Sequence, residues 1–175
     1  NKSIISIPKN SENVYIENLC LKYTGAFGIS GGWSIKGITI KNCEIGWIGG
    51  SIHKVASNTR YGNGIQFYGQ TNDTVVDHCW IYQVYDAGLT HQYTGGDNGN
   101  PESTAVNISY TNNLLEFCAY SLEYFWSWKV NDKFVDNPNV YMKDILVENN
   151  IMRFAGYGIS EDRPDPTNMG HVITS

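Results

Sequence analysis

Four carboxylates in this 175-residue chain lie beside short glycine-aliphatic or serine-aliphatic steps. Asp86 and Glu123 stand in the middle of the chain, and Glu161 and Asp162 follow near its C-terminal end. Glycosidic hydrolysis needs two carboxyl groups, one to protonate the leaving oxygen and one to activate water or attack the sugar. We therefore predict these four carboxylates as catalytic candidates. We also predict that His91 orients or protonates one of them.

Amide, hydroxyl and aromatic side chains accompany the carboxylates. Each aligned segment begins with an aliphatic residue that we expect to point into a core: Ile65, Leu89, Leu122 and Ile159. Strand alternation then turns intervening residues outward, and such mixed side chains stack on sugar rings and bind their hydroxyls. The predicted substrate-binding residues are Gln66, Tyr68, Thr90, Gln92, Phe125 and Trp126. Further aromatic candidates, which core or loop packing would also explain, are Trp47, Tyr93 and Trp128.

A sequence repeat predicts the elements that position these residues. Five segments share an aliphatic-polar-Asn pattern, with the Asn column at Asn18, Asn42, His78, Asn112 and Asn149. The first spacing, 24 residues, matches one coil of a β-solenoid with three short strands. The later spacings are 36, 34 and 37 residues, which is one coil plus roughly 10 to 13 residues that loop out. Helical periodicity is not sustained anywhere.

The looped-out residues are expected to project from one side of the solenoid. They are residues 50–63, 93–104 and 127–140, with a fourth excursion beginning near Arg163. Loops on a rigid scaffold commonly carry binding sites, so we expect them to wall a groove. The alternative is that loop length is simply tolerated, because closure entropy grows slowly with length.

Two columns of the repeat have structural explanations. Asn tolerates the left-handed backbone of a tight bend, and stacked carboxamides bond along the axis, so the Asn column is predicted to be a structural ladder. Cys43 and Cys79 share another column and are expected to be free buried thiols. Cysteine spacing typical of a zinc site is absent.

The repeat resembles that of the right-handed parallel β-helix superfamily typified by pectate lyases and polygalacturonases. Its pattern covers roughly residues 12 to 162 and implies an all-β, right-handed solenoid. Members act as polysaccharide lyases, glycoside hydrolases, epimerases, phage tailspikes and adhesins. The resemblance implies a polysaccharide or oligosaccharide partner, and a secreted or periplasmic location. We expect residues 1–175 to be one segment, continuous with further coils of a longer β-helix.

Hydrolysis without a cofactor is the favoured activity, and two alternatives remain open. Elimination by a lyase needs a base, commonly Lys or Arg in β-helix lyases, and the candidates are His53, Lys54, Arg60, Lys129, Lys133 and Arg163. Calcium would assist elimination, and residues 97–100 (Asp-Asn-Gly-Asn) offer oxygen donors without forming an EF-hand. The other alternative is a non-catalytic carbohydrate-binding, adhesin or stalk segment.

Charge and hydrophobicity exclude other classes of partner. The chain carries 12 Lys and Arg against 17 Asp and Glu, a net charge of −5. Bulk charge of this sign does not attract nucleic acid or anionic lipid, and it attracts polyuronate poorly. Apolar residues come only in short runs, so no segment is expected to span a bilayer.

Overall fold

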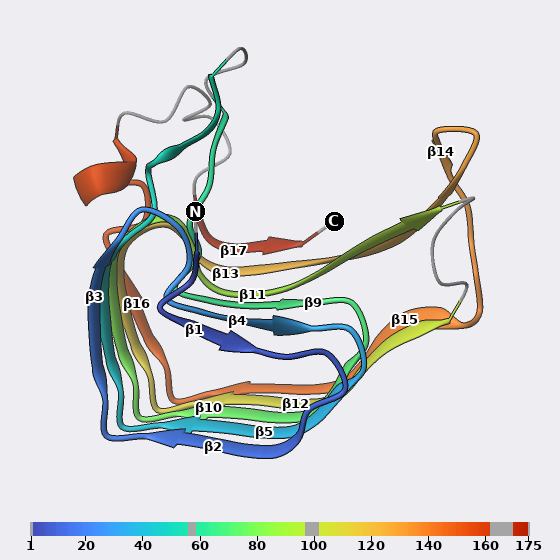
Figure 1. The fold of residues 1–175 in the computed structure, drawn as a ribbon, viewed down its shortest axis with the longest axis horizontal. Coiled ribbons are helices and arrows are strands. Elements are labelled where there is room, and N and C mark those ends of the chain that lie inside the picture. The colour runs from blue at the N-terminus through green and yellow to red at the C-terminus, as the bar shows by residue number, and fades with distance from the viewer. Residues whose placement is uncertain (1, 56–58, 97–101, 162–169, 175) are drawn as a thin grey trace.

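The chain winds as a parallel β-solenoid, which confirms the all-β fold expected from the repeat. The structure is a computed structural model that describes residues 2–55, 59–96, 102–161 and 170–174. Successive coils stack so that equivalent strands lie side by side (Figure 1). In the described ranges no helix is both long and apolar enough to cross a membrane.

Two walls of the solenoid are long parallel sheets. The first wall consists of β2 (Glu12–Glu17), β5 (Ile35–Lys41), β10 (Thr71–Asp77), β12 (Ser103–Thr111) and β15 (Val140–Glu148). The second consists of β1 (Ile5–Ile7), β4 (Ile29–Gly32), β9 (Ile65–Tyr68), the later part of β11 (Trp80–Gly96), the later part of β13 (Leu114–Val130) and β17 (Gly170–Thr174). This second wall carries the candidate site.

A shorter third wall joins them. It consists of β3 (Cys20–Thr24), β6 (Glu44–Ile48), the first residues of β11 and β13, and β16 (Ile151–Arg153). Strands β11 and β13 continue from the third wall round a corner into the second, and the β11–β13 register shifts at this corner between Val84 and Ala87.

Left-handed backbone conformations form three columns, five residues apart along each coil. The first column is Asn13, Gly37, Asp73, Asn107 and Asp144. The second is the Asn column of the repeat, Asn18, Asn42, His78, Asn112 and Asn149. The third is Tyr23, Trp47, Gln83, Phe117 and Phe154. Asn, Asp and Gly tolerate positive φ, so the first two columns are explained by residue type.

The Asn column has the expected backbone but does not form the expected ladder. Asn42 Nδ2 donates to Glu17 Oε1 at 3.1 Å, and Asn112 Nδ2 donates to Asp77 Oδ1 at 2.9 Å. The carboxamide ladder lies one residue later, where Asn113 Nδ2 donates to Asn150 Oδ1 at 2.9 Å. The reason is direction: the corner residue points outward, and its successor points into the coil.

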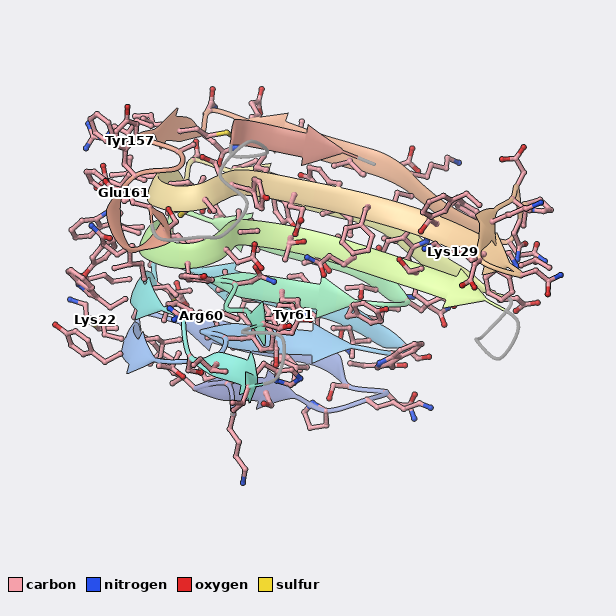
Figure 2. The ribbon with its side chains drawn as sticks, turned by 90° about the horizontal axis from the view of Figure 1, so that it is seen from above. Lys22, Arg60, Tyr61, Lys129, Tyr157 and Glu161 are labelled. Carbon is pink, nitrogen blue, oxygen red and sulfur yellow. The ribbon has the colours of Figure 1, made fainter. Side chains whose placement is uncertain are left out.

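The insertions rise on the same side of the solenoid, at the two ends of the second wall (Figure 1). At one end stands an antiparallel hairpin, β7 (Ile52–Lys54) and β8 (Thr59–Arg60). At the other end, β11 and β13 extend beyond their neighbours and β13 folds back on β14 (Lys133–Phe134). Figure 2 looks down on the face between them, with Arg60 and Tyr61 over the hairpin and Lys129 at the far end.

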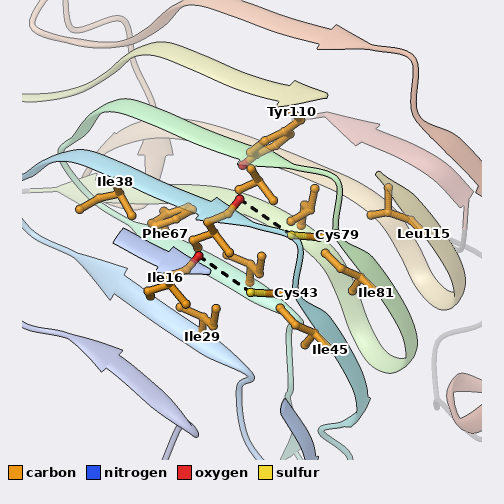
Figure 3. Packing of buried hydrophobic residues seen from close by; sticks show 14 of the residues in the cluster. Ile16, Ile29, Ile38, Cys43, Ile45, Phe67, Cys79, Ile81, Tyr110 and Leu115 are labelled. Atoms are coloured by element: carbon orange, nitrogen blue, oxygen red, sulfur yellow. Dashed lines mark hydrogen bonds between the residues drawn. The ribbon is translucent and has the colours of Figure 1, made fainter. Parts of the chain in front are cut away.

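Aliphatic columns fill the interior. Ile45 and Ile81 are fully buried beside the thiols of Cys43 and Cys79 (Figure 3). The Cys43 and Cys79 Sγ atoms contact the carbonyl oxygens of the coil below, and burial raises the pKa of Cys79 to about 12. Both are free and buried, as predicted, whereas Cys20 is free and exposed.

One segment departs from the predicted alignment. Gly158-Ile159 repeats the glycine-aliphatic step of earlier coils, but Gly158–Ser160 forms a short 3-10 helix, η2. Gly156 and Gly158 adopt φ of 82° and 79°, which turns the chain out of the strand direction. The strand that pairs with β13 at this level is β17, with Val172 opposite Leu122.

Candidate functional site

The strand register of the second wall gathers most of the predicted site on its outer face. Gln66, Thr90 and Glu123 occupy one lateral row, and Tyr68, Gln92 and Phe125 occupy the row two residues further on. A cavity of about 390 Å³ opens over these rows. Its lining residues are Phe27, Tyr61, Asn63, Gln66, Tyr68, Asp86, Gln92, Tyr120, Glu123 and Phe125.

Glu123 is held by two donors from the neighbouring strand. Thr90 Oγ1 donates to Glu123 Oε2 at 3.2 Å, and Gln92 Nε2 donates to the same oxygen. The two converging donors fix the direction of the Glu123 carboxylate. Because Oε2 accepts both hydrogen bonds, the arrangement suits an ionised carboxyl group, whose oxygens act only as acceptors. Thr90 itself is fully buried, so it positions Glu123 and does not line the cavity.

Asp86 reaches the same cavity from the corner of the coil. Its backbone N–H donates to the Gly62 carbonyl at 3.1 Å, which ties this corner to the residues after β8. Thr90, four residues beyond Asp86, lies opposite Glu123. Four strand positions span about 13 Å and one rung adds about 4.8 Å. The two carboxylates therefore approach the cavity from different positions along the wall.

Asn63 is a site residue that sequence reasoning missed. Its side chain is 3% exposed, accepts from the Ala87 N–H at 2.8 Å and donates to Gln66 Oε1 at 2.6 Å. Asn63 thereby orients Gln66 and fixes the bend beside Asp86. The signal was present in the repeat, because Asn63 immediately precedes the Gly64-Ile65 step. Phe27 and Tyr120 also line the cavity and also immediately precede such a step, Gly28-Ile29 or Ser121-Leu122. The sequence prediction missed these two residues as well.

The structure places His91 in the core, away from the carboxylates. The side chain is fully buried, with Nδ1 hydrogen-bonded to the Tyr110 hydroxyl and the ring 4.7 Å from that of Phe67. Burial lowers the pKa of His91 to about 3. The predicted role beside a carboxylate is wrong because strand alternation turns His91 inward with Leu89.

Glu161, the first of the two C-terminal carboxylates, does not join the Glu123 cavity. Glu161 is exposed after η2, where its Oε1 accepts from the Gly158 N–H at 3.2 Å. Its predicted position on the next rung is wrong because η2 replaces the expected strand. Asp162 lies outside the described residues.

Trp126 points away from the Glu123 cavity. Its Nε1 donates to the Ser103 carbonyl at 3.0 Å, and its ring packs 5.4 Å from Tyr93, which is fully buried. Beside it opens a larger cavity of about 1060 Å³. The aromatic residues that line this second cavity are Phe125, Trp126, Trp128 and Phe134. Phe125 lines both cavities.

The described cations among the suggested lyase bases, His53, Arg60, Lys129 and Lys133, are not lining residues of the Glu123 cavity. Arg60 lines a separate pocket, and the Lys129 ammonium lies 4.5 Å from the centre of the Phe134 ring. The imidazole of His53 packs against Tyr61, and Lys133 is exposed. The side chain of Lys54 and all of Arg163 lie outside the described part of the chain.

Within residues 2–55, 59–96, 102–161 and 170–174, no group of three or more His, Cys, Asp or Glu side chains is arranged to hold a metal ion. The candidate calcium donors at residues 97–100 lie outside these ranges.

Comparison with protein-family models, with curated proteins and with solved structures finds no match. The resemblance to the parallel β-helix superfamily therefore rests on the repeat and on the solenoid architecture.

Proposed function

We propose that the chain hydrolyses glycosidic bonds of a polysaccharide in the Glu123 cavity. The observation that supports this is the convergence of two carboxyl groups, three amides and several aromatic rings on one cavity. Aromatic faces stack on sugar C–H surfaces, amides bind hydroxyls, and the carboxyl pair supplies the acid and the base. A polysaccharide substrate implies a secreted or periplasmic protein.

The surroundings of the carboxyl groups suggest their roles. Glu123 is the base that activates water, because Thr90 and Gln92 both donate to it. Asp86 is the acid, because its backbone N–H bonds to Gly62, next to Tyr61, and the following residue Ala87 pairs with Tyr120. Aromatic surroundings of this kind are typical of a catalytic acid. Water attacks the anomeric carbon as Glu123 accepts its proton, while Asp86 gives its proton to the departing oxygen.

The register favours inversion of the anomeric configuration. The backbones of Asp86 and Glu123 differ by one rung and four strand positions, so the two side chains must lean towards each other to bring their carboxyl groups to the roughly 6.5–9.5 Å that inversion uses. Retention would require about 5 Å. Elimination is less well supported, because the described lining of the cavity offers no Lys, Arg or His as a base.

The test is turnover of a panel of neutral and acidic polysaccharides by Asp86→Asn and Glu123→Gln. We expect each substitution to lower kcat by about 10²–10⁴-fold, with an unchanged circular dichroism spectrum. Glu12→Gln is the matched control, because Glu12 is exposed on β2, in the first wall. A proton NMR time course should show that the first reducing ends released have the inverted anomeric configuration.

Three outcomes would contradict the proposal. Undiminished turnover in both variants would remove the carboxyl pair from the mechanism. A product that absorbs in the ultraviolet would indicate elimination. Binding without turnover by the wild type would identify a carbohydrate-binding module.

A further inference from the structure

The third left-handed column is occupied by residues that do not favour its backbone. Tyr23, Trp47, Phe117 and Phe154 adopt φ of 62°, 57°, 55° and 56°. The other two columns hold mainly Asn, Asp and Gly, which accept this conformation readily. Bulky aromatic residues do not, and strained backbone of this kind concentrates at functional sites.

Trp47, one member of this column, borders a pocket. Its side chain is 42% exposed, and one side of it stacks on Tyr23 with ring centres 6.4 Å apart and planes at 21°. The pocket has a volume of about 330 Å³. Its lining residues are Trp47, Gly49, Gly50, Arg60, Tyr85 and Ile159.

This pocket is separate from the Glu123 cavity, although both use the same segments. Arg60 and Tyr61 are adjacent (Figure 2), yet Arg60 lines the Trp47 pocket and Tyr61 the Glu123 cavity. Tyr85 and Asp86 divide in the same way. Tyr85 and Asp86 are consecutive residues of β11, so alternation turns their side chains to different sides. The backbone between the two pockets is tightly packed: a Cβ added at Gly62 would lie 2.0 Å from the Gly49 Cα.

We propose that the Trp47 pocket is a second carbohydrate site that holds one hexopyranose unit of a polysaccharide. The apolar face of the sugar ring stacks on the Trp47 indole. Arg60 donates to the sugar hydroxyls, because a guanidinium carries five N–H donors and serves several partners at once. The volume falls at the small end of ligand pockets. The site binds glycan whether or not the Glu123 cavity cleaves it.

The competing explanation is that Trp47 only packs against Tyr23 to stabilise the solenoid. Trp47→Asn separates the two explanations, because Asn is the residue that the neighbouring column uses at the same backbone conformation. A binding role predicts that the variant unfolds at the same or a higher temperature than the wild type and loses glycan. A packing role predicts a lower unfolding temperature.

The experiment is electrophoresis of the full chain in native gels containing hydroxyethyl cellulose, galactomannan, xyloglucan, dextran, alginate or polygalacturonate. To weaken binding in the Glu123 cavity, the substitutions of Trp47 and Trp80 are made in a Phe125→Ala background, and the wild type and Phe125→Ala alone run beside them. We expect at least one polysaccharide to retard Phe125→Ala, and the added Trp47→Asn to raise its dissociation constant at least tenfold. Trp80→Ala is the matched control, because Trp80 is 41% exposed on the third wall and does not line the Trp47 pocket.

Four results would overturn the proposal. The first is that none of the six polysaccharides retards the wild type, and the second is that the Phe125→Ala substitution alone abolishes retardation. The third is equal retardation with and without Trp47→Asn, and the fourth is a lower unfolding temperature for Trp47→Asn. Glu123→Gln keeps this test separate from hydrolysis: loss of turnover with retained retardation supports both sites. Turnover that survives Glu123→Gln counts against the hydrolysis mechanism alone.

Discussion

A buried imidazole makes the fold sensitive to acid. His91 is enclosed by Phe67, Tyr110 and Tyr124, and none of the described groups around it offers a charge to balance a proton. Burial lowers its pKa from 6.5 to about 3. The unfolded chain therefore binds this proton more readily than the folded chain, and the associated stability is complete above pH 6.5 and lost as the pH falls towards 3.

We predict that His91→Phe removes this pH dependence. Wild-type unfolding free energy should fall by up to about 1.4 kcal/mol per pH unit between pH 6.5 and 3 through this group, measured by urea denaturation at pH 7, 5 and 4. The variant should be less stable at pH 7, because the Tyr110 hydroxyl loses its partner, but should show a smaller slope. His53→Asn, at an exposed histidine that packs on Tyr61, should keep the wild-type slope. Equal slopes in all three proteins would refute the assignment.

The residues that hold Glu123 should affect rate more than binding. Thr90→Val keeps the shape of a buried side chain but removes one of the two donors to Glu123 Oε2. We expect kcat to fall by about tenfold with an unchanged KM, measured by steady-state kinetics. Thr74→Val is the control, since the Thr74 hydroxyl is buried without a hydrogen-bond partner among the described residues. A rise in KM alone would show that Thr90 acts in substrate binding.

At the scale of elements, the buried amide ladder links three coils. Asn113 Oδ1 accepts from the Cys79 N–H at 2.9 Å, and its Nδ2 donates to the Val76 carbonyl and to Asn150 Oδ1, both at 2.9 Å. The side chain is 1% exposed. Its loss would remove the side-chain partner of two backbone groups, the Cys79 N–H and the Val76 carbonyl, which is costly in a buried environment.

We predict that Asn113→Ala lowers the unfolding free energy by about 2–4 kcal/mol. Asn112→Gly, one residue earlier, should cost less than about 1 kcal/mol, because Asn112 is exposed and glycine accepts its φ of 56°. Chemical denaturation measures both. Equal losses of unfolding free energy in the two variants would mean that the outward-pointing Asn column stabilises the solenoid as much as the buried ladder does.

The repeat predicted the elements well because it reports local properties. Left-handed backbone at Asn18 and Asn42 follows from residue type, and strand alternation correctly turned Gln66 and Glu123 outward. The η2 turn was missed because the Gly158 step matches the earlier ones in sequence. The chain leaves the strand direction at Gly158, and the strand that pairs with β13 is the later β17. A local sequence pattern does not show which later segment forms the paired strand.

At the scale of the molecule, the insertions stand at the two ends of one face, the outer face of the second wall (Figure 1). The spacing of the repeat predicted that the insertions lie on one side of the solenoid. It did not predict that they stand at opposite ends of the second wall, because this depends on whether each insertion precedes or follows the strand of that wall. The Glu123 cavity and the larger aromatic cavity at the β13–β14 end share Phe125 as a lining residue. A polysaccharide that passes Glu123 in one direction would therefore continue over Trp126 and Trp128.

This arrangement predicts that the benefit of the larger cavity depends on substrate length. The Trp128 ring lies directly against Gly95, where an added Cβ would come within 2.4 Å of the ring, so the indole is a fixed platform. Trp128→Ala should lower kcat/KM by about tenfold for long oligosaccharides and leave the shortest cleaved oligosaccharide unaffected, because only long chains reach the platform. Size-fractionated fragments of the degraded polysaccharide provide the series. Tyr15→Ala, at an exposed tyrosine in the first wall, should change neither value. A loss that is the same at every length would place Trp128 in the support of the catalytic cavity instead of in a glycan subsite.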